Sequence, residues 1–169
     1  ILSLRAEEET LMIEQAMQYL DAGKEEGAQW KRIGASLNKP VEKFKRLASG
    51  KNVSEVWGKA TAVIHASSEI VLSYLWLLDS HKRTRQHIRK NGKLIRRVEY
   101  LPDTRTQLSD IGKEFPGALT NRLFSMRSVW GKVENDDSSL LVIAGKPREL
   151  DPEAFEAIKL QCGGMIQAT

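Results

Sequence analysis

Residues that could carry acid–base or nucleophilic chemistry are few in this chain and lie far apart. It contains three histidines and one cysteine in 169 residues. His81 and His87 are six positions apart, which does not place two ligands of one metal on the same side of a helix. Cys162 has no basic or histidine neighbour in sequence that would favour its thiolate. Neither a GxSxG nucleophile turn nor a GxxxxGK[ST] phosphate loop occurs. We therefore expect the histidines to be surface or structural residues, and the sequence predicts no enzyme, no metal and no cofactor.

Basic residues are concentrated in one block near the middle of the chain. Eight lysines and arginines and no acidic residue lie between His81 and Arg97, so the net charge of +4 leaves the rest of the chain at −4. Such a block is typical of a solvated face. It is also typical of a surface that attracts acidic lipid headgroups, where each basic residue contributes roughly 1 kcal/mol. Nucleic acid is a weaker candidate, because no aromatic residues alternate with the charges. The candidate membrane-surface contacts are Arg83, Arg85, Arg89 and Lys90.

The apolar residues do not form a membrane span, since no run approaches the roughly 18 residues that a span requires. A single cysteine excludes an internal disulfide and fits a reducing compartment. We expect a cytoplasmic domain that can lie at the periphery of membranes. We also expect it to belong to a longer protein with other domains.

The first 50 residues are predicted to be mainly helical. Apolar residues recur at helical spacing over 2–22. Shorter helical patterns cover 28–37 and 41–47, and a linker around Ser49-Gly50 follows. We therefore place a helical segment and linker at 1–50 and the main domain at 51–169.

The main domain is predicted to combine helices with an antiparallel sheet. A strand is expected at 56–64, and a helix at 69–79 that is apolar nearly all round and so should be buried against a sheet. Further strands are expected at 94–101, 104–111, 119–133 and 140–144, the last two joined by a hairpin at Asn135–Ser138, while 154–162 fits either a helix or a strand. This order of elements indicates an α+β fold.

One side of the strand that follows Leu119 carries the candidate ligand-binding residues. Alternation places Arg122, Phe124, Met126, Ser128 and Trp130 on the same side. Core packing would explain the three large apolar side chains equally well. A cation on an apolar face must find a partner or water, so Arg122 either orients a ligand in a cavity or lies at a solvated edge.

Two stretches together suggest a family. The segment EVWGKATAVIHASSEIVLSYLW, followed by FPGALTNRLFSMRSVW, resembles the START lipid-transfer domain, and most closely the START-like modules of large algal and protist proteins. The resemblance covers about 54–169. It implies a helix-grip fold, in which a curved antiparallel sheet wraps a long C-terminal helix around a cavity; here the last strands and that helix are expected to be missing. In the family the second stretch reads approximately Asn-Arg-Asp-Phe, and this chain has Asn121, Arg122 and Phe124 with Leu123 at the acidic position.

The resemblance implies non-enzymatic binding of a lipid, a sterol-like molecule or another apolar ligand in an internal cavity, for sensing or transfer. The alternative is a degenerate START-like regulatory or interaction module of a larger signalling protein, without a ligand; the loss of the acidic residue at Leu123 favours it. Nucleic-acid binding through 81–97 ranks third. Expected partners are thus a small apolar molecule, an anionic membrane surface and other domains of the parent chain, with no nucleic acid.

Overall fold

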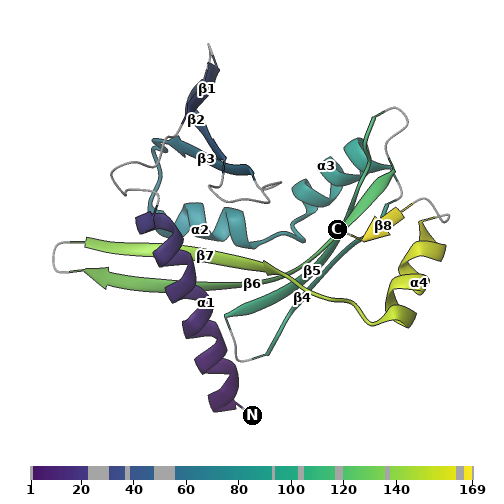
Figure 1. Ribbon diagram of the computed structural model, residues 1–169. Helices are drawn as coiled ribbons and strands as arrows, with labels where there is room; N and C mark the ends of the chain where they lie inside the picture. The colour runs from purple at the N-terminus through teal and green to yellow at the C-terminus, as the bar shows by residue number, and fades with distance from the viewer. Residues whose placement is uncertain are drawn as a thin grey trace. The chain divides into compact units, whose positions relative to one another are not determined.

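The computed structural model describes residues 2–22, 31–36, 39–47, 56–92, 94–102, 105–116, 120–135, 138–162 and 166–168 (Figure 1). The chain divides into two compact units, of which the larger comprises Ile1–Ala16 with Ser68–Thr169 and the smaller Met17–Ser67. The elements, in order, are α1 (Leu2–Ala22), β1 (Lys31–Ser36), β2 (Lys39–Leu47), β3 (Val56–Ala62), α2 (Ser68–Trp76), α3 (His81–Asn91), β4 (Arg96–Tyr100), β5 (Thr106–Lys113), β6 (Asn121–Asn135), β7 (Ser138–Pro147), α4 (Pro152–Gln161) and β8 (Ile166–Ala168).

A five-stranded sheet organises the larger unit. Strands β4, β5, β6 and β7 are antiparallel neighbours in that order, and β8 pairs with the start of β6 in parallel. The β6–β7 pairing runs to Asn135 opposite Ser138, so the predicted hairpin is confirmed. The fold is therefore α+β with antiparallel sheets, as predicted, and β8 is the one parallel strand among the described pairings.

The two faces of this sheet have different coverings. The α1 face carries Leu123, Val129 and Gly131 of β6, and its two buried clusters include residues of α1 and α4. The alternate residues of β6 form the opposite face, which we call the α3 face because Lys113 on it shares a pocket with α3. Helices α2 and α3 run along one side of the sheet (Figure 1).

The hydrophobic core lies on the α1 face. One buried cluster joins Leu123 and Ile166 of the sheet to Ile158 and Cys162 at the end of α4. A second cluster is formed by Met12, Val129 and Ala144, with Ile13 and Ala16 of α1 packed against it.

A buried carboxylate also fixes α1 on the sheet. Glu9 is only 5% exposed and accepts hydrogen bonds from the Thr106 hydroxyl at 2.6 Å and from the Arg105 backbone N–H at 3.1 Å. The predicted helix over 2–22 is confirmed. The side of the helix that carries Glu9, Met12 and Ile13 packs on the sheet through both apolar and polar contacts.

The smaller unit contains an antiparallel sheet in the order β1–β2–β3. The helix predicted over 41–47 is wrong, because those residues pair one for one with Val56–Ala62. The helix predicted over 28–37 is wrong where it is described, since 31–36 form β1. Segments this short make only marginal helices, because helix nucleation is costly, and strand pairing supplies more backbone hydrogen bonds. The predicted linker at 48–52 lies outside the described residues.

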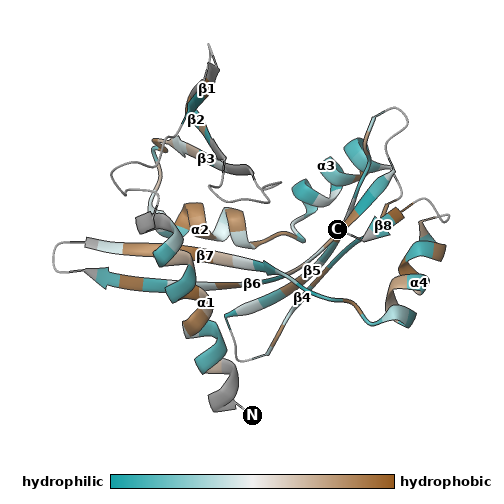
Figure 2. Cartoon of the chain, in the orientation of Figure 1, coloured by the Kyte–Doolittle hydropathy of each residue, from teal (hydrophilic) through white to brown (hydrophobic). Residues whose placement is uncertain are grey.

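Helix α2 differs from its prediction in both length and burial. It ends at Trp76, where Leu77–Ser80 turn into α3, instead of running to Asp79. No residue of α2 is buried, although most of the helix is apolar (Figure 2), and Ile70 is 63% exposed. The expectation of a buried helix is therefore wrong: α2 contacts β7 but leaves much of its apolar surface uncovered. Within the described part of the chain, no helix combines the length and hydrophobicity needed to cross a bilayer.

Candidate binding site

The first part of the basic block forms helix α3 (His81–Asn91), which separates the candidate membrane contacts into two groups. Arg83 and Lys90 line a pocket together with His87 at spacings of one helical turn. Arg85 and Arg89 are exposed and do not line it. The structure thus brings together two of the four residues and leaves the other two on the solvent side of the helix.

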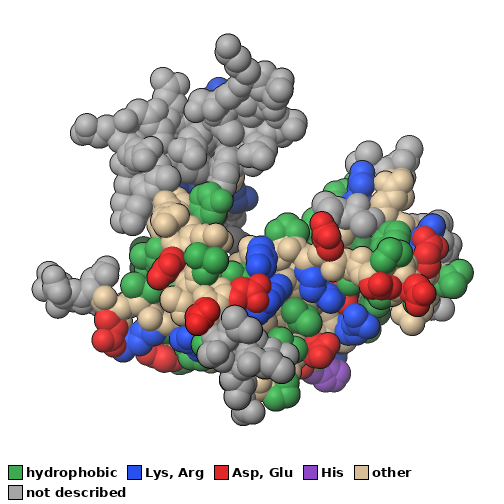
Figure 3. Space-filling model, turned by 60° about the horizontal axis from the view of Figure 1, so that its bottom comes forward, with side chains coloured by type: hydrophobic (Ala, Val, Ile, Leu, Met, Phe, Trp, Pro, Cys, Tyr) green, Lys and Arg blue, Asp and Glu red, His purple; other side chains and the backbone are tan. Residues whose placement is uncertain are grey.

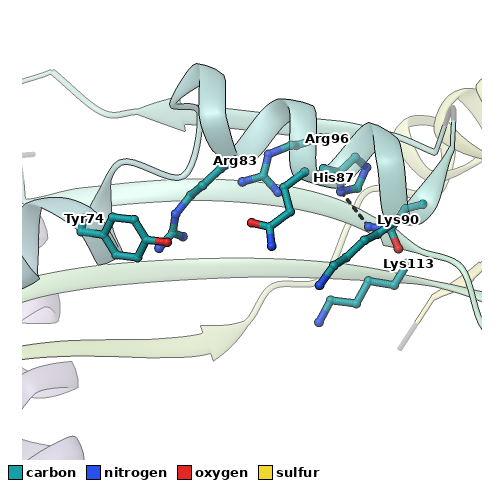
Figure 4. Close-up of a pocket in the computed structure, with 8 residues that line it drawn as sticks. Tyr74, Arg83, His87, Lys90, Arg96 and Lys113 are labelled. Atoms are coloured by element: carbon teal, nitrogen blue, oxygen red, sulfur yellow. Dashed lines mark hydrogen bonds between the residues drawn. The ribbon is translucent and has the colours of Figure 1, made fainter. Parts of the chain in front are cut away.

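The pocket lies between α3 and the α3 face of the sheet and has a volume of about 300 Å³. Among the described residues that line it, four are cations from three different elements, and none carries a carboxylate. Figure 4 shows Lys90 of α3 and Lys113 of β5 extending in the same direction, with Arg83 reaching towards Tyr74. The residues that line it are Tyr74, Arg83, Gln86, His87, Lys90, Asn91, Arg96 and Lys113.

Aromatic rings position two of these cations. The guanidinium carbon of Arg83 lies 4.7 Å from the centroid of the Tyr74 ring. The Lys113 ammonium lies 4.7 Å from the centroid of the Phe124 ring. Such contacts stabilise a cation without neutralising it, and stacking of Arg83 leaves the in-plane N–H groups of its guanidinium to other acceptors.

The surroundings of Arg96 disfavour its charged form. Its terminal nitrogen donates a hydrogen bond to the Leu78 carbonyl, while its Nε is buried without a hydrogen-bond partner. Burial lowers the pKa of Arg96 from its usual value, and repulsion by Arg83 lowers it further, against weaker opposition from Asp79 and Tyr100. An unpaired buried donor beside a second cation favours an incoming anion.

His87 is a structural residue of this pocket. It is only 6% exposed, its Nε2 lies 2.9 Å from the Leu94 carbonyl oxygen, and its Nδ1 lies 3.1 Å from the Asn91 amide nitrogen. The Asn91 amide is oriented because its oxygen accepts from the Glu114 backbone N–H at 3.2 Å. Nε2 must therefore donate to Leu94 and Nδ1 must accept from Asn91, which ties the end of α3 to the connection that leads into β4.

The residues expected to line a cavity share the α3 face of β6. Phe124, Met126, Ser128 and Trp130 are each partly buried, and none is closed off from solvent. Arg122 is exposed at the end of this row, opposite Lys113 in the register of β5 and β6. Phe124 also contacts Lys113, so the apolar row begins directly beside the basic pocket.

The α1 face holds an ion-pair cluster that no sequence pattern indicated. Asp110 is only 1% exposed and bonds to Arg97 at 2.8 Å and to Arg148 at 2.7 Å. Leu123, where the START resemblance led us to expect an acidic residue, lies in the core on this same face. Its identity therefore does not change the lining of the α3 face.

A second hollow, of about 650 Å³, lies beside α4. Leu123, Leu150 and Phe155 supply apolar lining, and Ser125 and Arg148 each place a buried polar atom there without a hydrogen-bond partner. Among the residues that the structure describes, no group of three or more His, Cys, Asp or Glu side chains is placed to hold a metal ion.

Comparison with known proteins identifies no relative: no protein-family model, no curated protein and no solved structure matches this chain.

Proposed function

We propose that the larger unit binds a lipid or a similar apolar molecule, without catalysis, on the α3 face of its sheet. The observation that carries this proposal is that large apolar residues on this face are only partly covered. Phe124, Met126 and Trp130 of β6 remain partly exposed, and Ile143, which pairs with Trp130, is 36% exposed. Contiguous apolar surface of this kind is typical of ligand-binding and interaction sites.

The neighbouring charges favour a lipid over a second protein as the occupant. The apolar row on the α3 face ends at Lys113 and the basic pocket, so one end of this surface is apolar and the other end is cationic. A lipid with an acidic headgroup has the same division. Burying its chain contributes roughly 0.8 kcal/mol per CH₂, so a few methylenes give useful affinity without further polar contacts.

The proposal also supplies a finer description of the fold. The antiparallel sheet with α2 and α3 along one side would correspond to the gripping sheet of the START-like helix-grip fold, with the ligand on the same side as those helices. The ligand-free regulatory module remains the competing function, and the exposed apolar surface of α2 would then be its contact surface.

The test is a titration of the 169-residue protein with a short-chain diacylglycerol, an uncharged apolar probe, combined with native mass spectrometry for co-purifying lipid. Met126→Glu places a carboxylate on the α3 face at a partly exposed position, where it can still reach water. Since a buried Met side chain contributes about 1.5–3 kcal/mol, we expect diacylglycerol binding to weaken by roughly tenfold or more.

The matched control is Leu160→Glu, the same kind of change at an α4 residue that is 78% exposed. It should leave binding unchanged. Absence of any lipid or diacylglycerol binding by the unmodified protein would favour the ligand-free module. Equal binding by both variants would move the site away from the α3 face, to the hollow beside α4.

We further propose that the solvent side of α3 contacts anionic membranes. Lys82, Arg85 and Arg89 are exposed on this helix, and Ile88 between them is 59% exposed. A basic surface with an exposed apolar residue favours the interface of an acidic bilayer.

A further inference from the structure

The pocket lined by Arg83, Lys90, Arg96 and Lys113 is a phosphate-binding site, as we infer from its four positive charges, the unpaired Nε of Arg96 and the contribution of cations by three elements. This inference deepens the proposed function, because it names the headgroup of the ligand. It rests on a separate set of residues, so that it can fail or hold independently.

The charge of the pocket calls for an anion. None of its four cations forms an ion pair with a carboxylate among the described residues, whereas Arg97, Arg105, Arg127 and Arg148 on other parts of the unit all do. Four positive charges around about 300 Å³ repel one another, as the electrostatic effect of Arg83 on Arg96 shows. A bound anion relieves this repulsion.

The donor geometry favours a phosphate group over a carboxylate. Two arginines offer planar forks, and two lysines, one on α3 and one on β5, offer point charges that extend in the same direction (Figure 4). A carboxylate has two oxygens in one plane and a single charge. A phosphomonoester has three terminal oxygens in different directions and a charge of about −1.5 to −2 near neutral pH. A pocket with four cations on three elements matches the larger charge and the third oxygen of the second acceptor better.

Contacts around the pocket hold two of its cations and the end of α3 in place. Cation–π contacts with Tyr74 and Phe124 hold Arg83 and Lys113 in place, and both side chains keep their positive charge. His87 hydrogen-bonds to Leu94 in the α3–β4 connection, and Asn91 accepts from Glu114 directly after β5, so the end of α3 is tied to both segments. Two of the four cations are thus held in place, and binding a phosphate to them loses less side-chain entropy than at a flexible basic surface.

Phosphate chemistry can come from a lipid headgroup or from a free phosphate, and three probes distinguish the sources. Isothermal titration calorimetry of the 169-residue protein would use inorganic phosphate, a short-chain phosphatidic acid, and the uncharged diacylglycerol with the same chains. If a lipid headgroup is the natural occupant, phosphatidic acid should bind more tightly than either of the other two. If a free phosphate is the occupant, inorganic phosphate should bind as tightly as phosphatidic acid.

The decisive variant is R83Q/K90Q, and its matched control is R85Q/R89Q. Both remove two positive charges from the same helix, but only the first removes them from the pocket. Since a charge-assisted hydrogen bond contributes about 1.5–3 kcal/mol, R83Q/K90Q should weaken binding of both phosphate probes by roughly tenfold or more. Binding by R85Q/R89Q should stay close to that of the unmodified protein. Lys113→Gln, on β5, provides an independent variant if the helix variant loses structure by circular dichroism.

The outcomes separate this inference from the proposed function. Equal losses in R83Q/K90Q and R85Q/R89Q, or no loss in R83Q/K90Q and Lys113→Gln, would overturn the phosphate site. Diacylglycerol binding that is abolished by Met126→Glu would still support the apolar site in that case. Conversely, inorganic phosphate binding that depends on Arg83, Lys90 and Lys113, with no diacylglycerol binding, would support the phosphate site and overturn the apolar one.

Discussion

Single charged residues in this protein differ sharply in whether they have partners. Asp110 is enclosed between Arg97 and Arg148, and Glu9 is enclosed by backbone and hydroxyl donors. Both carboxylates are buried on the α1 face and are fully bonded, which is the condition under which buried charge is tolerated. On the α3 face the charged side chains that the structure describes in the pocket are all cations. The contrast between two faces of one sheet is the main reason for assigning structure to the first and binding to the second.

Glu8 provides a test of the α1 face at the level of one side chain. Glu8 forms ion pairs with Lys146 at 3.0 Å and with Arg127 at 2.6 Å. Acidic and basic side chains lie next to one another across the face shown in Figure 3. The hydrogen bond from Lys146 lowers the pKa of Glu8 below its usual 4.5; burial opposes this and Arg127 adds to it. A carboxyl group with a lowered folded-state pKa stabilises the fold above its unfolded pKa, and this contribution is lost as the pH falls through the folded value.

We therefore expect the free energy of unfolding to fall as the pH is lowered below about 4.5, and Glu8→Gln to fall less steeply than the unmodified protein. Urea titrations at a series of pH values would measure this. Glu7→Gln is the matched control, because Glu7 is the exposed preceding residue of α1. Identical pH slopes for the unmodified protein and Glu8→Gln would show that the Glu8 contacts do not persist in solution.

At the level of elements, success in predicting the fold followed the length and clarity of the patterns. Helix α1 and strands β3 to β7 were predicted close to their observed positions, because long helical periodicity and alternation survive in any packing. Strands β1 and β2 were predicted as helices, since their patterns are short and their pairing partners lie elsewhere in the chain. Helix α3 was not predicted at all, because Ile88 is its only aliphatic residue and gives no apolar stripe.

The docking of α1 rests on a close approach that sequence patterns do not reveal. A Cβ at Gly131 would lie 3.2 Å from Cγ1 and 3.4 Å from Cδ1 of Ile13. Gly131 is buried, so the absence of a side chain there is what lets the helix reach the sheet. Overpacking of this kind costs about 1–3 kcal/mol when the neighbour cannot move.

Gly131→Ala should accordingly lower the free energy of unfolding by roughly 1 kcal/mol, because Ile13 and its helix must shift outward. Urea unfolding would measure the change. A double-mutant cycle with Ile13→Val supplies the control, since removing a methylene from Ile13 should recover part of the loss if the two residues meet. Strictly additive effects would mean that α1 does not rest on Gly131.

At the scale of the whole molecule, the sequence shows that basic residues are clustered, but only the fold shows which of them line the pocket. The sequence predicted a basic block and four candidate contacts. The structure shows that Arg83 and Lys90 face a pocket whose other cations, Arg96 and Lys113, come from β4 and β5. No spacing rule connects Tyr74, Arg96 and Lys113, so the pocket could not have been predicted. The row from Phe124 to Trp130 could be, because strand alternation alone places those residues on one face.

This division of the basic block gives opposite expectations for membranes and for the pocket. An anionic bilayer is a plane, and in the proposed contact it meets the solvent side of α3 with Arg85 and Arg89, whereas Arg83 and Lys90 line the pocket. In flotation with phosphatidylserine-containing vesicles at low salt, R85Q/R89Q should reduce binding by roughly thirtyfold, at about 1 kcal/mol for each basic residue removed. R83Q/K90Q removes the same charge and should reduce binding far less, and raising the ionic strength should abolish the difference by screening both groups. Vesicles of neutral lipid provide the control for apolar association. Equal losses in the two variants would show that net charge alone, and not the orientation of α3, determines membrane contact.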